Sequence, residues 1–501
     1  MLKKLFFPLF LAAGCVHYVF AAWYVLHGDI VFTSEIGRDF LLLRELDAKK
    51  IVFIGPSSSS GLFHGPLWSY LNYPAYLISG GNPVIVGWWW VVLGILFGIG
   101  NYFIGKKLFN KTVGVLFALM SSLYVSYHTR DMYNPHGAML LIPAFFFFFV
   151  RYLQTKKLKF LIFHIILGGC IIQFQMAIGI PFIILSFAWI LVYVIREKKY
   201  LDILSFGLVP VLLSNFLLFD LRHQFLITKL AFHFLGSGGR THPAYGQLLM
   251  DRLNMMFSSV EIIRADPGGR NLLLFFILLV FLAIQFKVKK YRLIYSAFLY
   301  FYVGFFALSM INVGGPLLYF YLFPLFPLVF LIFSSFATSP FKPVFYVIFI
   351  VVYFFNLQAA FSDIQSSKGI IGIDQYSWKF LLTASEKIYQ GPEQSFGYFV
   401  YSPNVVAYEG KYAMWYTGKN TQSNGKYFSK QPVTYLLIAP PPPNNPFMKE
   451  DFWIKNQVHI ESSPSAEIKF PNGYKILKYS LNTEAVKVPF DPGIDPGLTF
   501  R

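Results

Sequence analysis

The stretch PVIVGWWWVVLGILFGIGNYFIGKKLFNK, residues 83–111, determines the class of fold. Residues 83–105 carry no charged side chain, and Lys106, Lys107 and Lys111 follow directly. About 20 consecutive apolar residues are enough for a helix to cross the hydrocarbon core of a bilayer. The stretch is apolar all round rather than along one stripe, which is typical of a membrane span and not of a soluble helix. It predicts a transmembrane helix with a basic end.

The same pattern recurs along the chain and predicts a polytopic α-helical membrane protein. Only 13% of the residues are charged, against about 25% in soluble domains. The eleven predicted transmembrane helices cover residues 5–26, 83–105, 112–127, 137–153, 160–178, 180–195, 201–219, 271–286, 293–312, 317–335 and 343–358. We interpret the first as a helix that is not cleaved, because its apolar run exceeds that of a signal peptide. The run Phe145–Phe149 is expected to face lipid.

The net charge of +18 comes largely from short loops at every second helix end. The basic residues on this side are Lys3, Lys4, Lys106, Lys107, Lys111, Lys156, Lys157, Lys159, Arg196, Lys198, Lys199, Lys287, Lys289, Lys290, Arg292 and Lys342. Cytoplasmic loops of membrane proteins carry such an excess. The charge therefore predicts a plasma-membrane protein with a cytoplasmic N-terminus and an exterior C-terminal domain. It does not indicate nucleic-acid binding.

Composition and hydropathy divide the chain into three predicted parts. Residues 1–359 form a transmembrane domain with long outer loops at 27–82 and 220–271. Residues 360–485 form a small exterior α/β domain, and 486–501 form a loose tail. Within the exterior domain the predicted elements are helices at 376–389 and 405–416 and strands at 396–400 and 433–438. In the first outer loop, 35–46 and 66–78 are amphipathic and are expected to form interfacial helices.

Ionisable residues gather at the outer ends of the predicted helices. Those at or near helix ends are Glu35, Arg38, Asp39, His64, Arg130, Asp131, His136, Asp220, Arg222 and His223. Charged groups at membrane depth are costly and usually functional. The alternative is a solvated rim of loop charges, and the residues alone leave both interpretations open. We expect the carboxylate of Glu35 or Asp39 to line an outward-facing cavity near the membrane surface, with Arg222 or His223 across it.

Two runs in the first outer loop resemble a known family. They are Glu35-Ile36-Gly37-Arg38-Asp39 and His64-Gly65-Pro66-Leu67. Their order and sidedness resemble the GT-C-type integral membrane glycosyltransferases of family 39, the protein O-mannosyltransferase and aminoarabinose-transferase branch. The chain departs from the family at two positions: Glu35 stands where the family has Asp, and Ile36 stands where it has a second acid.

The resemblance implies transfer of a sugar from a polyprenyl-phosphate donor to a hydroxyl acceptor, by a single displacement that inverts the anomeric configuration. The acceptor class stays open between protein, lipid and glycan. Glu35, or alternatively Asp39, would be the base. The basic residues implied at the donor phosphate are Arg38, Arg222 and Arg240. The residues implied at the sugar or acceptor are His64, Arg130, Asp131, Asn134, His136 and His223. For cofactors, the resemblance leaves open a divalent metal ion with His64 and His223 as ligands. The alternative for His64 is a capping or acceptor-contact role. A transporter or flippase of lipid-linked sugars is the alternative function.

The sidedness of the basic residues generates a test of topology. In a chain whose Cys15 and Cys170 are replaced by alanine, we introduce single cysteines at Thr155 and Asn420. A membrane-impermeant maleimide applied to intact cells should label Asn420→Cys and leave Thr155→Cys unlabelled until the membrane is permeabilised. The reverse labelling pattern would contradict the predicted orientation.

Overall fold

The computed structural model describes residues 2–58, 62–236, 245–258, 261–264, 269–310, 318–403, 406–421, 424–441 and 450–495. The chain forms two compact units that interleave along the sequence. The first comprises Met1–Ala21, Val52–Leu71 and Trp90–Asp363, and the second comprises Ala22–Ile51, Asn72–Trp89 and Ile364–Arg501. The predicted domain boundary at residue 359 falls close to the last of these segments, which begins at Ile364.

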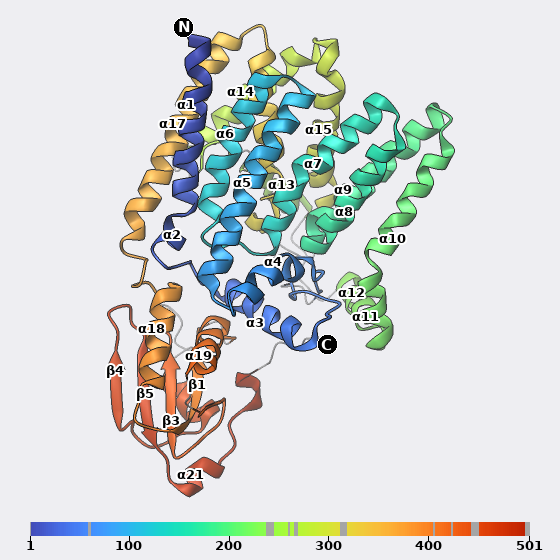
Figure 1. Cartoon of the computed structure of the whole chain (residues 1–501). Coiled ribbons are helices and arrows are strands. Elements are labelled where there is room, and N and C mark those ends of the chain that lie inside the picture. The colour runs from blue at the N-terminus through green and yellow to red at the C-terminus, as the bar shows by residue number, and fades with distance from the viewer. Residues whose placement is uncertain are drawn as a thin grey trace. The chain divides into compact units, whose positions relative to one another are not determined.

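Each of the eleven predicted membrane segments contains helix (Figure 1). The helices are α1 (Leu2–Ala21), α5 (Pro83–Leu108), α6 (Lys111–His128), α7 (Asn134–Thr155), α8 (Leu158–Phe174), α9 (Met176–Arg196), α10 (Leu208–Leu212), α11 (Ser214–Arg222), α14 (Arg270–Phe286), α15 (Arg292–Ser309), α16 (Phe326–Ser335) and α17 (Lys342–Ser367). Within the described residues, five helices are by themselves long and apolar enough to cross a membrane. The protein is therefore a mostly helical membrane protein, as predicted.

The predicted helix at 201–219 differs from the structure. A 3₁₀ turn at Tyr200–Gly207 and α10 are followed by α11, with a bend of 42° between the two parts. Pro210 lies in α10 and has no N–H group to donate to the preceding turn. Proline inside a helix removes a hydrogen bond and breaks the helix. Pro210 thus affects the turn where the 3₁₀ segment changes to α10, and the bend itself follows at Leu213.

Aromatic side chains fill the interior of the first unit, and this corrects one expectation. Phe145, Phe146 and Phe149 are buried rather than facing lipid. The rings of Phe145 and Phe149 lie 5.8 Å and 5.0 Å from that of Phe301. His164, fully buried beside them, is bonded by its ring nitrogens to the Phe145 carbonyl and the Ser186 hydroxyl, each at 2.9 Å. A ring this large is worth more in helix packing than against lipid, which is already apolar.

Side-chain hydrogen bonds connect helices that are far apart in sequence. His17 of α1 lies 2.7 Å from both Ser122 of α6 and Tyr353 of α17. The Thr129 hydroxyl donates to the Ala21 carbonyl at the end of α1, at 2.7 Å. Figure 1 shows α1 running beside α17. These contacts satisfy buried polar groups, which are costly if left without partners.

The second unit contains a five-stranded sheet in the order β2-β1-β3-β5-β4. The strands are β1 (Ser395–Tyr401), β2 (Asn424–Tyr427), β3 (Val433–Ile438), β4 (Ala466–Lys469) and β5 (Lys475–Ser480). β1 pairs in parallel with β2 and β3, while β5 is antiparallel to both β3 and β4. The predicted strands at 396–400 and 433–438 are β1 and β3. The short, mostly exposed strands β2 and β4 have no apolar alternation that the sequence could reveal.

Helices α18 (Trp378–Tyr389) and α19 (Tyr408–Asn420) pack on one face of this sheet (Figure 1). Tyr389 of α18 contacts Phe396 of β1, with ring centroids 5.1 Å apart. Gly410 of α19 approaches Val400 of β1. Phe396 and Val400 are four positions apart in the strand, so their side chains point to the same face of the sheet. The predicted helices at 376–389 and 405–416 correspond to α18 and α19. Short helices α20 (Glu450–Trp453) and α21 (Thr483–Lys487) complete the described part of this fold.

The first outer segment contributes to the second unit through two contacts. Asp29 is fully buried and accepts hydrogen bonds from the Ser377 hydroxyl at 2.6 Å and from the backbone N–H groups of Gly372 and Lys379, each at 3.0 Å. Helix α3 (Ser34–Lys49), predicted at 35–46, lies against α19. A Cβ atom on Gly37 would lie 2.5 Å from the Glu409 backbone nitrogen, so only glycine fits there. The predicted helix at 66–78 is α4 (Leu67–Ile78).

The close approach at Gly37 gives a stability test. Gly37→Ala forces α3 away from the α19 backbone and should cost about 1–3 kcal/mol, as overpacking usually does. Gly246→Ala is the matched control, because Gly246 lies in a helix and a Cβ there meets no atom within 4 Å. Thermal unfolding of the purified chain, followed by tryptophan fluorescence, should show a lower midpoint for Gly37→Ala alone. Equal midpoints for the two variants would contradict the packing.

Candidate functional site

The predicted site residues fall into two groups, each within one compact unit. Glu35, Arg38 and Asp39 lie on α3 of the second unit. The residues of the first unit are His64, Arg130, Asp131, Asn134, His136, Arg222 and His223. Arg240 lies outside the described residues.

The first turn of α3 presents two carboxylates in different surroundings. Thr33 is extended and begins the helix, and Glu35 follows in the first turn with an exposed side chain. An acidic residue there is favoured by the partial positive charge of a helix N-terminus. Asp39, one turn later, is buried and accepts from Arg38 Nε at 3.1 Å and Nη2 at 2.9 Å. Glu35 is therefore the accessible carboxylate, and Asp39 is held in an ion pair.

Glu409, which the sequence analysis did not select, lies beside this turn. It lies in the first turn of α19, is 2% exposed, and accepts a hydrogen bond from the Ser402 hydroxyl at 3.0 Å. Burial raises the pKa of the Glu409 carboxyl, and the nearby charge of Glu35 adds to the effect, although its hydrogen bonds oppose it. One signal was present in the sequence: Glu409 is the sole acidic residue in the predicted helix 405–416.

In the first unit, Tyr127 joins two arginines at the end of α6. The guanidinium carbons of Arg130 and Arg264 lie 3.9 Å and 3.0 Å from the centre of the Tyr127 ring. Arg264 forms an ion pair with Asp363, and Arg130 Nε lies 4.0 Å from Asp131. Aromatic faces attract such cations. The cluster holds two guanidinium groups at the end of α6 that contains Tyr127. Arg264 was not among the site residues predicted from the sequence.

Asn134 and His136 contact protein groups at the start of α7. The Asn134 side-chain amide donates to the Phe174 carbonyl at 2.9 Å. His136 Nδ1 accepts from the Tyr133 backbone N–H at 3.1 Å, and its Nε2 lies 2.9 Å from His128 Nδ1. These bonds cap α7 and connect it to the ends of α6 and α8. A contact of either residue with sugar stays a prediction.

His64 lies in a segment that docks onto the break between α8 and α9. Its backbone N–H donates to the Pro56 carbonyl at 2.9 Å, and Gly65 donates to the Gln173 carbonyl at 2.9 Å. Gly65 allows this contact because a Cβ atom would overlap the Gln173 side chain. Gln175, two residues after Gln173, has an extended backbone and separates α8 from α9. Its side chain is fully buried. The first outer segment is thus held to helices much later in the sequence.

The residues at the end of α11 differ in exposure. Asp220 is buried and accepts from the Ile227 backbone N–H at 2.6 Å and from the Thr228 hydroxyl, so it caps α12 (Leu226–Gly236). His223 lies against Phe219, with ring centroids 4.3 Å apart, and Phe219 in turn contacts Phe63 at 5.8 Å. Arg222 is exposed and, among the described residues, has no hydrogen bond or ion pair. It is available to an anionic ligand.

Metal binding at His64 and His223 stays a prediction. Among the described ranges, no group of three or more His, Cys, Asp or Glu side chains is placed to hold a metal ion. The set of donors needed for a resident metal is therefore not assembled from these residues alone.

No protein-family model and no curated protein sequence matches the chain. Solved structures do match. ArnT from Cupriavidus metallidurans bound to undecaprenyl phosphate aligns with a TM-score of 0.58 at 11% identity, covering 97% of this chain and 99% of that one. The apo ArnT structure aligns with the same TM-score at 10% identity, over 98% and 100% of the two chains. The chain therefore has the GT-C fold over its whole length, including the small C-terminal sheet domain.

The buried Glu409 generates a test by pH. Because burial raises the pKa of Glu409 in the folded chain above the ordinary glutamate value of 4.5, the stability that this group contributes is fully present below about pH 4.5 and is lost as the pH rises through the folded pKa. The melting temperature of the wild-type chain should therefore fall more between about pH 4 and about pH 7.5 than that of Glu409→Gln, which cannot ionise. The exposed Glu484 supplies the control: Glu484→Gln should follow the wild type. A fall in Glu409→Gln equal to that of the wild type would contradict the assignment.

Proposed function

We propose that this protein is a glycosyltransferase of the family-39 type that moves a sugar from a polyprenyl-phosphate donor to an acceptor hydroxyl at the outer face of the membrane, with inversion. The observation that carries the proposal is the whole-chain fold match to ArnT, one of whose structures holds undecaprenyl phosphate. Fold alone does not determine activity. The accessible acid and the available arginine supply the chemistry that such a transfer needs.

Glu35 is the proposed general base. The acceptor oxygen forms a bond to the anomeric carbon of the sugar while its proton passes to the Glu35 carboxylate. The bond from the anomeric carbon to the phosphate oxygen breaks, and its electron pair leaves with the polyprenyl phosphate. Attack from the face opposite the leaving group inverts the configuration. Glu35 is preferred over Asp39 as the base because its carboxylate is exposed, whereas that of Asp39 is paired with Arg38.

Positive charge, rather than a general acid, serves the leaving group. The departing phosphate ester is already an anion, so its oxygens need cations and hydrogen-bond donors. Guanidinium groups match phosphate oxygens in pairs. Arg222 is the proposed donor-phosphate residue because it is exposed and has no ion pair within the described part of the chain. Arg240 stays a proposed partner of the same phosphate, and Arg130, Asp131 and Asn134 stay proposed sugar contacts.

The role of Glu35 predicts a selective loss of catalysis. Glu35→Gln keeps the shape of the side chain but cannot take the acceptor's proton, so transfer should fall by roughly 10²–10⁴-fold. Binding of the donor should change little. The assay follows transfer from a polyprenyl-phosphate sugar in liposomes, with titration of the donor. Asp47→Asn is the matched control, since Asp47 lies on the same helix about 18 Å further along.

Two outcomes separate the assignments. If Glu35→Gln were fully active, the base would be assigned to Asp39 instead. If Asp39→Asn were also fully active, a carboxylate base would be contradicted.

Arg222→Ala should differ from Glu35→Gln by raising the donor concentration required as well as slowing transfer, because the same charge binds the donor and stabilises the leaving group. Movement of the lipid-linked sugar across the liposome without transfer would favour a flippase instead.

A further inference from the structure

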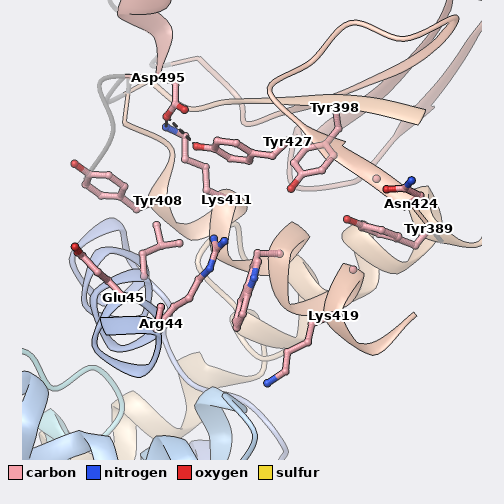
Figure 2. Close-up of a pocket in the computed structure, with 15 residues that line it drawn as sticks. Arg44, Glu45, Tyr389, Tyr398, Tyr408, Lys411, Lys419, Asn424, Tyr427 and Asp495 are labelled. Atoms are coloured by element: carbon pink, nitrogen blue, oxygen red, sulfur yellow. Dashed lines mark hydrogen bonds and ion pairs between the residues drawn. The ribbon is translucent and has the colours of Figure 1, made fainter. Parts of the chain in front are cut away.

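A cavity of about 730 Å³ lies within the second unit, between α3 and the α/β fold. Leu41, Arg44, Glu45 and Ala48 line it from α3, and their spacing places them on one helix face. Residues of α19, β1 and β2 supply the other walls. Figure 2 shows the Arg44 side chain extending from α3 toward these elements. None of the residues proposed for catalysis lines this cavity, so it is a separate site.

The lining carries a cation that has no carboxylate partner. Glu45 accepts from Lys49 at 2.5 Å, and Asp495 accepts from Lys411 at 2.7 Å, so both acids of the lining are already paired with lysine. The Arg44 guanidinium lies 4.8 Å from the centre of the Trp415 ring and, among the described residues, makes no ion pair. A planar guanidinium held on an aromatic face keeps its N–H groups for a ligand. The cavity is therefore suited to an anion.

Neutral polar groups surround this cation. The side-chain amide of Asn424 and the hydroxyl of Tyr408 line the cavity and have no hydrogen-bond partner among the described residues. Tyr398 and Tyr427 add aromatic surface, and the Tyr427 hydroxyl donates to Asp495 at 2.8 Å. Figure 2 shows Asn424 and these two tyrosines along the wall formed by the α/β fold. Hydroxyl, amide and aromatic groups around one arginine offer many hydrogen bonds and few aliphatic contacts.

We propose that this cavity binds a saccharide that carries an anionic substituent, either phosphate or carboxylate. Arg44 would hold the anionic group with paired hydrogen bonds. Asn424 and Tyr408 would bind sugar hydroxyls, and the electron-rich ring faces would pack against the C–H face of the sugar. A cavity of this volume is within the range of small-molecule sites, about 300–1,000 Å³. A polyprenyl chain does not fit this chemistry, because Leu41 and Ala48 are the only aliphatic side chains in the lining described.

The place of this site in the reaction rests on the proposed function, under which it would hold an anionic glycan acceptor. The binding itself does not depend on that function. A glycan bound by a side group away from the reacting hydroxyl contributes affinity and orientation, which lower the barrier for transfer by positioning. Arg44 is thus proposed as a specificity-determining residue rather than a catalytic one.

The test uses the full chain in detergent and measures binding by saturation-transfer NMR and calorimetric titration. The probes are glucose 6-phosphate, glucuronic acid, methyl glucoside and inorganic phosphate. Wild type should bind the two charged sugars more tightly than methyl glucoside or phosphate. Arg44→Gln should weaken binding of the charged sugars by roughly 10-fold or more, the value of a charge-assisted hydrogen bond. Lys50→Gln, which removes one charge from the same helix outside the cavity, should bind like wild type.

Further arms define the results that would overturn the proposal. Asn424→Ala should weaken binding of charged and uncharged sugars alike, and thermal unfolding checks that each variant is folded. Absence of sugar binding, or an equal loss in Arg44→Gln and Lys50→Gln, would overturn the site. Tight binding of inorganic phosphate equal to that of glucose 6-phosphate would also overturn it, because the sugar would then not be recognised. A parallel titration of the wild-type chain with undecaprenyl phosphate tests the proposed function separately. If the chain binds the charged sugars but does not bind this lipid, only the proposed function is refuted.

Discussion

A bilayer offers no hydrogen-bond partner to a peptide group, and the rest of this structure depends on that constraint. Chains that cross the hydrocarbon must satisfy their backbone internally, so the spans are helical. The same constraint keeps charged side chains out of the spans and collects them at helix ends. Some of the polar side chains that remain inside are bonded to other helices, as His17 and His164 are. The candidate residues described above accordingly lie at helix ends, in the segments between helices and in the second unit.

The second unit is assembled from pieces that lie far apart in the sequence. The buried carboxylate of Asp29 receives hydrogen bonds from residues around 372–379, and Gly37 allows the backbone of α3 to meet that of α19. A buried carboxylate is tolerated only when several donors satisfy it. These two contacts place the first turn of α3, with Glu35 and Asp39, beside the C-terminal fold. They also create the walls of the Arg44 cavity.

The three carboxylates near the start of α3 show how surroundings divide one chemical group into different roles. Glu35 is exposed, Asp39 is paired with Arg38, and Glu409 is buried with a raised pKa. Of the three, Glu35 is the group that a bound substrate could reach without first breaking an ion pair. Neighbouring ionisable groups whose surroundings differ are the usual basis of acid and base assignments. The proposed base follows from this comparison.

The sequence by itself determined the fold class, the positions of most helices and the two central strands β1 and β3 of the C-terminal sheet. Apolar length and alternation encode those features locally, as residues 83–105 and 433–438 do. Tertiary structure alone decided that Phe145 and Phe149 are buried and that α3 belongs with the C-terminal fold. It also decided that Glu409 lies beside Glu35 and that Arg44 lacks a carboxylate partner in the described chain. These features depend on contacts between residues hundreds of positions apart, which no local pattern records.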